Sequence, residues 1–432
     1  MPTNSLRLEC DCLLLAPNPS ALEINSSMKI LIVSQYFWPE DFAINALAQS
    51  LQAKGHTVEV LTGNPNYPEG KTYSGRSPWF CGTELWNNVL IHRLPLFPRG
   101  QRSGFRLALN YLSFLLGGIG LAPWLLRGRK YDIIFTCGYS PPFASLVASL
   151  VGWIKRCAVV HWVQDLWPES LRATGYVKSK LALSLMKHVV RFIYQRTDLL
   201  LIQSEGFRPL VAKLSCNVPI KYYPNSVDSN FFTPQPIALP SIAELDVGFA
   251  VLFAGNVGTA QAVEVIVEAA DLLRHESDIR FVVLGSGSRW DWMQEQVRKR
   301  GLSNLFLPGR FPSSAMPALM RKASALLVTL ADEEIFAATV PNKIQAYLAT
   351  GVPIIACLNG EGERIVLEAG AGFTAPAEDA KALAAVVLAL QRSSEITRQE
   401  MGRSGRAYFQ SHFDHDLLVD RLVVILSDLA RH

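Results

Sequence analysis

The sequence predicts an α/β protein built from two doubly wound parallel-sheet domains, each Rossmann-like, that face each other across a cleft. Apolar strand-like runs alternate with helical stretches in two separate halves of the chain, and a proline-rich stretch between them breaks the pattern. Near-continuous apolar strands are typical of parallel sheets covered on both faces. Because such folds bind ligands at the carboxyl ends of their strands, we expect the functional site in the cleft.

The first domain is predicted over residues 28–207. A helix is expected at Ile44–Lys54, and the strand-like runs are Lys29–Val33, Thr57–Thr62, Val89–Leu94, Ile133–Thr136, Ala158–Gln164 and Leu199–Gln203. Residues 1–27 lack the basic start and the continuous apolar core of a signal peptide. We interpret them as a disordered extension, or as the result of a mis-called start codon with Met28 as the true one.

Prolines collect between residues 208 and 245, which predicts an interdomain linker and hinge. The second domain is predicted over 246–410. Its alternating strand-like and helical runs are Ala250–Ala254, Ala262–Leu273, Arg280–Gly285, Trp290–Arg300, Leu305–Pro308, Pro317–Lys322, Ala325–Thr329 and Pro353–Cys357. Residues 411–432 are expected to form a C-terminal helix that packs back on the first domain.

Composition narrows the function classes. A net charge of +4 over 432 residues is too small to indicate nucleic-acid binding. Hydrophobic residues make up 49% and charged residues 18%, which is apolar for a soluble enzyme and suggests contact with a membrane. The seven cysteines show no metal-ligand spacing apart from the close pair Cys10 and Cys12, so a reduced, cytoplasmic protein is the simplest interpretation.

The run Val251–Gly258 is an apolar strand that ends in a glycine-containing turn before a helical stretch, and Thr339–Ile344 is a short loop that opens another helix. Turns of this kind present free backbone N–H groups and a positive dipole end, where a diphosphate binds. No GxGxxG follows the first strand and no GxxxxGK[ST] occurs, which disfavours dinucleotide and P-loop sites. A nucleotide-linked ligand of another kind is therefore expected.

Four motifs of the second domain stand in the order seen in family 4 glycosyltransferases: Phe253–Gly258, Val283–Gly287, Asn304–Gly309 and Ala346–Pro353. Phe37–Glu40 and Val163–Glu169 most resemble the branch that includes the colanic-acid and O-antigen sugar transferases. The resemblance covers residues 28 to 425 and implies the GT-B fold. It also implies retention at the anomeric carbon and no required metal.

The resemblance further implies the donor-binding residues, which are Gly255, Asn256, Val257, Gly258, Gly285, Arg310, Glu333, Glu334, Thr339, Pro341, Asn342 and Lys343. Asn256 stands where the family usually has an arginine, and Gln261 or Ala262 where it has a lysine. Lys343 is the candidate for a compensating cation, the alternative being an ordinary exposed lysine. Ala346 replaces a carboxylate that would hold the ribose, and Glu333 or Glu334 is expected to contact the donor sugar, unless they are solvated loop residues.

On the acceptor side, Asp165 at the end of a predicted strand is the candidate for the group that touches the acceptor hydroxyl. His161 is a second catalytic candidate, with a buried core histidine as the alternative. Aromatic and acidic residues after the first strand are expected to contact the acceptor or to plug the cleft; these are Tyr36, Phe37, Trp38 and Glu40.

The stretch Leu107–Leu126 contains no charged residue and is long enough to span a bilayer. Spanning would separate the strands on either side of it, so a helix lying in the membrane interface is favoured. A helix buried against the sheet is the alternative.

The sequence therefore predicts a glycosyltransferase that moves a hexose-type sugar from a nucleotide-sugar, UDP being the commonest carrier, to a polyprenyl-diphosphate-linked saccharide. It would act without cofactor or metal, in the cytoplasm, peripherally on the inner face of the plasma membrane. Two alternatives remain open: a nucleotide-sugar epimerase of the same shape, and a non-catalytic sugar-nucleotide-binding or scaffold protein.

Overall fold

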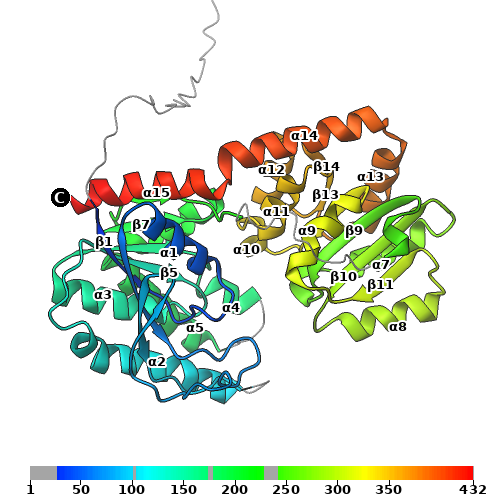
Figure 1. Cartoon of the computed structure of the whole chain (residues 1–432). Coiled ribbons are helices and arrows are strands. Elements are labelled where there is room, and N and C mark those ends of the chain that lie inside the picture. Colours follow the sequence, from blue (N-terminus) through cyan, green and yellow to red (C-terminus); the bar gives the residue numbers. More distant parts are fainter. Residues whose placement is uncertain (1–26, 101–103, 174–178, 228–241, 432) are drawn as a thin grey trace, which may run out of the picture.

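The computed structural model describes residues 27–173, except 101–103, together with 179–227 and 242–431. It contains two α/β domains, each built on its own sheet (Figure 1). The first sheet has the order β3-β4-β2-β1-β5-β6-β7-β8 and the second β11-β10-β9-β12-β13-β14. All pairings are parallel except that of β3 with β4. The predicted fold class is confirmed.

Helices cover both faces of the first sheet, which explains why its strands are apolar throughout. The strands are β1 (Lys29–Val33), β2 (Thr57–Gly63), β3 (Gly82–Trp86), β4 (Val89–Leu94), β5 (Ile133–Gly138), β6 (Ala158–Val163), β7 (Leu199–Ile202) and β8 (Ile220–Tyr222). The helices are α1 (Ala43–Ala53), α2 (Gly104–Leu125), α3 (Phe143–Lys155), α4 (Glu169–Ala173), α5 (Lys180–Gln195) and α6 (Arg208–Ser215). Core residues of α1 pack on one face and those of α2, α3 and α5 on the other.

The second domain repeats this arrangement. Its strands are β9 (Phe249–Asn256), β10 (Ile279–Ser286), β11 (Leu305–Gly309), β12 (Ala325–Thr329), β13 (Ile354–Cys357) and β14 (Gly372–Ala375). Its helices are α7 (Glu264–Leu272), α8 (Trp290–Arg300), α9 (Met316–Lys322), α10 (Glu334–Ala337), α11 (Asn342–Thr350), α12 (Glu361–Glu368), α13 (Ala380–Arg392) and α14 (Glu395–His412). Two buried clusters, one on each face of the sheet, form its core.

The last helix, α15 (His415–Ala430), returns to the first domain, as the red ribbon in Figure 1 shows. Leu418, Leu422 and Leu426 are buried in the cluster that also holds α1. Polar contacts reinforce the packing, since Nζ of Lys54 lies 2.6 Å from Asp420. The chain thus crosses between the domains twice, once after β8 and once between α14 and α15.

The linker predicted at 208–245 begins too early. Helix α6 and strand β8 lie within this range, and β8 pairs with β7 at the edge of the first sheet. The prolines that suggested a hinge are compatible with these elements, because Pro209 occupies the first turn of α6, where its missing N–H has no partner to lose. Most of the other prolines lie in 228–241, outside the described residues, as does the segment 1–26.

Candidate functional site

The carboxyl end of β9 and the turn that follows it are closely packed against the carboxyl end of β10 and the turn that follows that strand. A Cβ atom on Gly285 would lie 1.8 Å from the carbonyl oxygen of Gly255, and one on Gly287 would lie 2.2 Å from that of Val257. Only glycine fits at these positions, because the two backbones touch. Gly255 itself has a φ of +138°, which side chains with a Cβ rarely adopt. The predicted glycine turn therefore exists, and it exposes backbone at the carboxyl edge of the sheet.

Lys343, in the first turn of α11, extends across this turn. A Cβ on Gly255 would lie 2.7 Å from its Cε and 3.2 Å from its Nζ. The Nζ atom is buried, finds no hydrogen-bond partner in the part of the chain that the structure describes, and lies 3.6 Å from the centre of the Phe253 ring. Burial lowers the pKa of Lys343 from its ordinary value to about 7. Lys343 is therefore not the ordinary exposed lysine of the alternative interpretation: its amine is desolvated, and the described residues form no salt bridge with it.

Asn256 and Gln261 stand where the family usually has an arginine and a lysine, and they are hydrogen-bonded to each other. Nδ2 of Asn256 donates to Oε1 of Gln261 at 3.2 Å. A neutral amide pair thus occupies the place where the resemblance implies two cations. Val257 was predicted to contact the donor, but its side chain is fully buried and its N–H donates to the carbonyl of Ser286 at 2.9 Å. Because this N–H group already donates a hydrogen bond within the protein, it cannot donate one to a phosphate. Gly258 begins the short 3-10 helix Thr259–Gln261.

The remaining predicted donor residues divide into two groups. Pro341 and Asn342 open α11 beside Lys343, and no side chain of the described residues caps that helix. Thr339 lies just before them, and its hydroxyl donates to the carbonyl of Ile335 at 2.7 Å, closing α10. By contrast, Arg310 is exposed directly after the edge strand β11, two strands away from β9. The structure therefore gathers the Gly255 turn and the start of α11 but leaves Arg310 apart.

Asp165 lies just beyond the carboxyl end of β6, in the first domain. Its Oδ2 accepts a hydrogen bond of 2.6 Å from the Ser140 hydroxyl, which in turn accepts one of 2.8 Å from the Trp167 indole N–H. Burial raises the pKa of Asp165, and the bonds from Ser140 oppose that rise. This chain fixes one carboxylate oxygen and gives the group a stronger basicity than a solvated aspartate has. Ser140 was not predicted, because it lies in a separate loop after β5.

His161 was predicted as a second catalytic residue, but the structure places it in the core. Its side chain is 1% exposed, inside β6, and its ring meets that of Tyr194 edge to face at 5.6 Å. Burial lowers its pKa to about 3, so the imidazole is neutral at physiological pH. The buried core histidine was the correct interpretation, because alternate side chains of β6 point into the α3 and α5 layer.

The loop after β1 also departs from the prediction. Phe37 is fully buried against the Trp86 ring, and Tyr36 is buried and stacked on Phe42. Neither can present a face to an acceptor. Trp38 is partly exposed and stacks on Trp86 at 5.6 Å. Of the three predicted acceptor aromatics, Trp38 is the one that is partly exposed, although Trp86 and Arg76 lie against its ring.

Glu40, the fourth predicted acceptor residue, is a structural carboxylate. Its Oε1 accepts hydrogen bonds of 2.7 Å from the backbone N–H groups of Asn66 and Tyr67. Burial raises its pKa to about 7, although these bonds and the nearby Arg93 act in the opposite direction. Glu40 thus joins the loop after β1 to the loop after β2.

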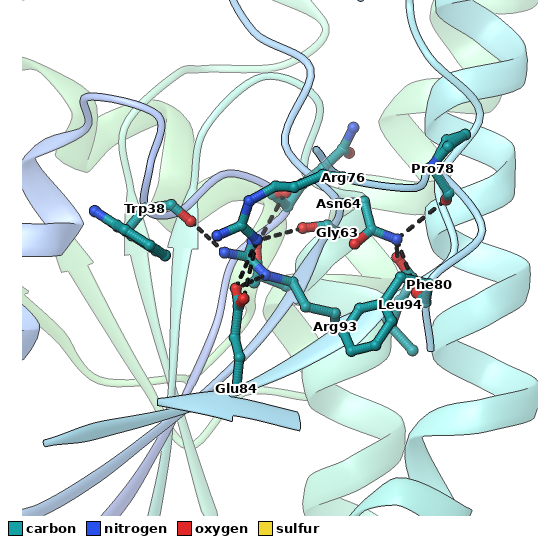
Figure 2. Close-up of polar contacts among 11 residues, drawn as sticks. Trp38, Gly63, Asn64, Arg76, Pro78, Phe80, Glu84, Arg93 and Leu94 are labelled. Carbon is teal, nitrogen blue, oxygen red and sulfur yellow. Dashed lines mark hydrogen bonds and ion pairs between the residues drawn. The ribbon is translucent and has the colours of Figure 1, made fainter. Parts of the chain in front are cut away.

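A buried arginine that sequence reasoning missed holds this loop in place (Figure 2). Arg93 is fully buried in β4 and donates to the carbonyls of Trp38 and Gly63 and, at 2.6 Å, to Glu84 of β3. Arg76 donates to the same carboxylate at 2.9 Å and lies over the Trp38 ring. The detectable signal was the pair of polar residues His92 and Arg93 inside a strand whose other residues are apolar.

Replacing Glu84 by Gln should destabilise the first domain by about 3 kcal/mol, the lower end of the range for breaking a buried ion pair, because Arg93 keeps its carbonyl partners. Urea unfolding measures the effect. Asp246→Asn provides the control, since Asp246 pairs with Lys322 on the surface and should lose at most about 1 kcal/mol. Equal losses in both variants would show that the Arg93 network does not stabilise the fold.

The two domains touch next to the site. The Ser204 hydroxyl donates to the carbonyl of Ala338 at 2.6 Å, and Nδ2 of Asn225 donates to Oδ1 of Asn342 at 2.8 Å. Ile335 of α10 is buried in a hydrophobic cluster of the first domain. A pocket of about 230 Å³ lies between α4 and α10, and Glu333, Glu334, Glu169 and Arg172 line it. Glu333 and Glu334 thus face the interdomain cleft.

Among the described residues, no group of three or more His, Cys, Asp or Glu side chains could hold a metal ion.

Comparisons with known proteins match a separate family to each of the two domains. Residues 42–225 match the family described as glycosyl transferase 4-like domain, and residues 248–393 match the family glycosyl transferases group 1. WbjE of Pseudomonas aeruginosa, itself a predicted glycosyltransferase, is 25% identical over 70% of this chain and 76% of its own length. WcaI of Escherichia coli K12, a predicted colanic acid biosynthesis glycosyl transferase, is 26% identical over 75% of this chain and 82% of its own.

Solved structures show the same fold. A sucrose-phosphate synthase from Thermosynechococcus elongatus superimposes with a TM-score of 0.70 at 18% identity, covering 94% of this chain and 99% of its own. HepE of Anabaena, solved in complex with UDP, gives a TM-score of 0.66 at 13% identity over 93% and 100%.

Proposed function

Because the chain belongs to the family 4 glycosyltransferases of GT-B fold, we propose that it transfers a hexose-type sugar from a UDP-linked donor to a polyprenyl-diphosphate-linked saccharide. The transfer would retain the anomeric configuration and need no metal. It would take place in the cytoplasm, with the protein bound peripherally to the inner face of the plasma membrane. The resemblance to glycosyl transferases of colanic acid biosynthesis supports the acceptor class.

The observation that carries the proposal is the buried Nζ of Lys343 beside Gly255, which has no hydrogen-bond partner among the described residues. Burying a lysine side chain with no counter-ion among the described residues is costly and lowers its pKa, so a protein that keeps a lysine there has a use for an anion at that point. The uncapped start of α11 adds backbone N–H groups and the positive end of the helix dipole. Together these groups fit a diphosphate.

In the proposed reaction, the bond between the anomeric carbon and the diphosphate oxygen breaks while a bond to the acceptor oxygen forms. Lys343 and the start of α11 stabilise the charge that develops on the departing UDP. Asp165 orients the acceptor hydroxyl and takes up its proton as the new bond forms. Trp38 is proposed to contact the acceptor saccharide.

A non-catalytic sugar-nucleotide-binding protein is the second candidate. The neutral pair of Asn256 and Gln261 favours it, because two charge-assisted bonds to the diphosphate are replaced by an internal amide contact. Such a protein would bind UDP and transfer nothing.

We expect UDP to raise the unfolding temperature of the purified protein without added metal, whereas GDP, dTDP, ADP and NAD do so less or not at all. Ligand binding stabilises a protein by about 2.7 kcal/mol at 100 times the dissociation constant. Transfer from a panel of UDP-hexoses to a short polyprenyl-diphosphate saccharide is then measured. Binding without transfer would favour the non-catalytic candidate, conversion of the UDP-hexose into its epimer would favour an epimerase, and no shift with any nucleotide would refute the donor site.

A further inference from the structure

Helix α2 packs on the first domain along one narrow stripe. Asn110, Phe114, Gly118 and Ala122 are its buried residues, spaced four apart. Gly118 is tightly apposed to α3, since a Cβ there would lie 2.4 Å from the Val147 side chain. Among the described helices α2 alone is long and apolar enough to span a membrane, yet this stripe fixes it to the sheet. The opposite side of α2, with Leu112, Leu116 and Ile119, is exposed to solvent.

The solvent-exposed sides of α2, α3 and α5 together form an apolar surface, which we call the helical face. More than half of the exposed large hydrophobic side chains of the described residues lie on these three helices. They are Phe105, Leu112, Leu116, Ile119 and Trp124 of α2, Trp153 and Ile154 of α3, and Leu181, Leu185 and Phe192 of α5. The exposed fraction reaches 77% for Trp153 and 82% for Leu181, so these large apolar side chains face solvent. A large exposed apolar surface of this kind marks a site of interaction with a protein or a membrane.

Helix α5 has the pattern of a helix that lies in a membrane interface. Leu181, Leu185 and Phe192 recur on the side opposite the buried Val190 and Ile193. Three exposed cations follow along one flank, namely Lys180, Lys187 and Arg191. Apolar residues outward with basic residues beside them are typical of surface-bound amphipathic helices.

A groove of about 1300 Å³ lies within the helical face, at the amino ends of β5, β6 and β7. Its apolar walls include Leu115, Ile119, Leu150, Trp153 and Phe192. Because the site occupies the carboxyl edge of the sheet, this groove lies at the opposite edge and is no part of the donor or acceptor site.

The charged residues of the helical face are basic. Helices α2, α3 and α5 contain no Asp or Glu. The two aspartates at the groove are engaged, because Asp132 accepts from the N–H of Lys29 and Asp198 from that of Val159. Within the described residues, no ion pair involves the exposed cations Arg127, Lys130, Arg156, Lys180, Lys187, Arg191 and Arg196.

We propose that the helical face, formed by three helices rather than by α2 alone, binds the surface of an anionic phospholipid bilayer. Trp153, Leu185 and Phe192 enter the apolar region, and the surrounding lysines and arginines contact the lipid phosphates. A second copy of the chain fits less well, because it would bring a second set of unpaired cations against the first. The contact deepens the proposed function by specifying its membrane surface, but it does not require transfer.

The test is flotation of the full chain with vesicles of phosphatidylglycerol and phosphatidylcholine, compared with phosphatidylcholine alone, in the absence of nucleotide. We expect flotation with the anionic vesicles that weakens as salt rises. The double variant Leu185→Ser/Phe192→Ser and the double variant Lys187→Glu/Arg191→Glu should each lower the partition constant at least tenfold. Matched controls are Leu367→Ser/Ile396→Ser and Arg298→Glu/Lys299→Glu, which alter exposed residues of the second domain.

Failure of the wild-type chain to float, or equal loss in the control variants, would overturn the proposal. A dimer in sedimentation that the Leu185→Ser/Phe192→Ser change dissociates, without vesicle binding, would assign the face to a second copy instead. UDP-induced stabilisation of the same variants separates the two questions. Variants that still bind UDP are folded, so their behaviour reports on the membrane surface and not on the donor site.

Discussion

Replacing Asp165 by Asn is expected to lower the transfer rate at saturating donor by about 10²–10⁴-fold while leaving UDP affinity unchanged. The amide is isosteric and still accepts the hydrogen bond from Ser140, so the loop keeps its shape. The amide carries no negative charge, so it can neither orient the acceptor hydroxyl as the carboxylate does nor take up the hydroxyl proton. Initial rates with a labelled UDP-hexose measure the first quantity, and thermal shift with UDP measures the second.

Asp198 provides the matched control. It belongs to the same sheet, but it precedes β7 at the edge opposite the cleft, where its Oδ2 accepts from the N–H of Val159. Asp198→Asn should therefore change the rate less than twofold. If Asp165→Asn is folded, binds UDP and transfers sugar at the normal rate, Asp165 has no part in catalysis.

The framework of both domains could be predicted because burial on two faces leaves a strong signal. Strands such as β1 and β9 are continuous apolar runs, and helices with one apolar face separate them. Glycines 255 and 285 also stood out, because a strand that ends in glycine indicates a close backbone approach. The structure shows that approach directly, in the contact between the two turns.

Side-chain direction was the part that the sequence could not supply. His161 and Asp165 are four residues apart, yet one side chain is enclosed beneath α5 and the other bonds to a loop after β5. Phe37 and Trp38 are neighbours, and the first is in the core while the second is accessible. Such differences depend on which neighbouring elements cover each position, and a single sequence does not reveal that.

The role of Lys343 illustrates the same limit. Its position at the start of a helix was visible, and a cation there is unfavourable for the helix dipole unless an anion is near. The burial of Lys343 could not be seen in the sequence. It depends on the fact that Gly255 has no side chain to occupy the space of Lys343, and on the Phe253 ring against which the amine lies. Those two features turn a surface lysine into a desolvated one.

Replacing Lys343 by Ala is expected to weaken UDP binding by about 1.5–3 kcal/mol, the range for a hydrogen bond to a charged group. Isothermal titration calorimetry measures the change. Lys381→Ala, which removes an exposed lysine of α13, serves as the control and should leave the affinity unchanged. Unaltered affinity in the Lys343→Ala variant would remove this lysine from the donor site.

The pH dependence provides a sharper test of the same residue. With a pKa of about 7 in the free protein, Lys343 is largely neutral at pH 8.5. Since the diphosphate binds the ammonium form, UDP binding above pH 7 must take up a proton. Affinity should fall by up to tenfold between pH 7.5 and 8.5, where phosphate groups are already ionised. The Lys343→Ala variant should lose this slope.

Stability of the unliganded protein should change in the opposite direction. The pKa of Lys343 in the folded chain lies below its ordinary value of 10.5, so the unfolded chain binds more protons between pH 7 and 10.5. The free energy of unfolding therefore gains from this residue as pH rises through that window, relative to Lys343→Ala. Affinity that falls while stability rises, with both effects absent in the variant, would mark Lys343 as a cation kept desolvated for an anionic ligand. A lysine in a salt bridge that stabilised the fold would have a raised pKa, so its contribution would stay constant between pH 7 and 10.5 and would be lost only above that range.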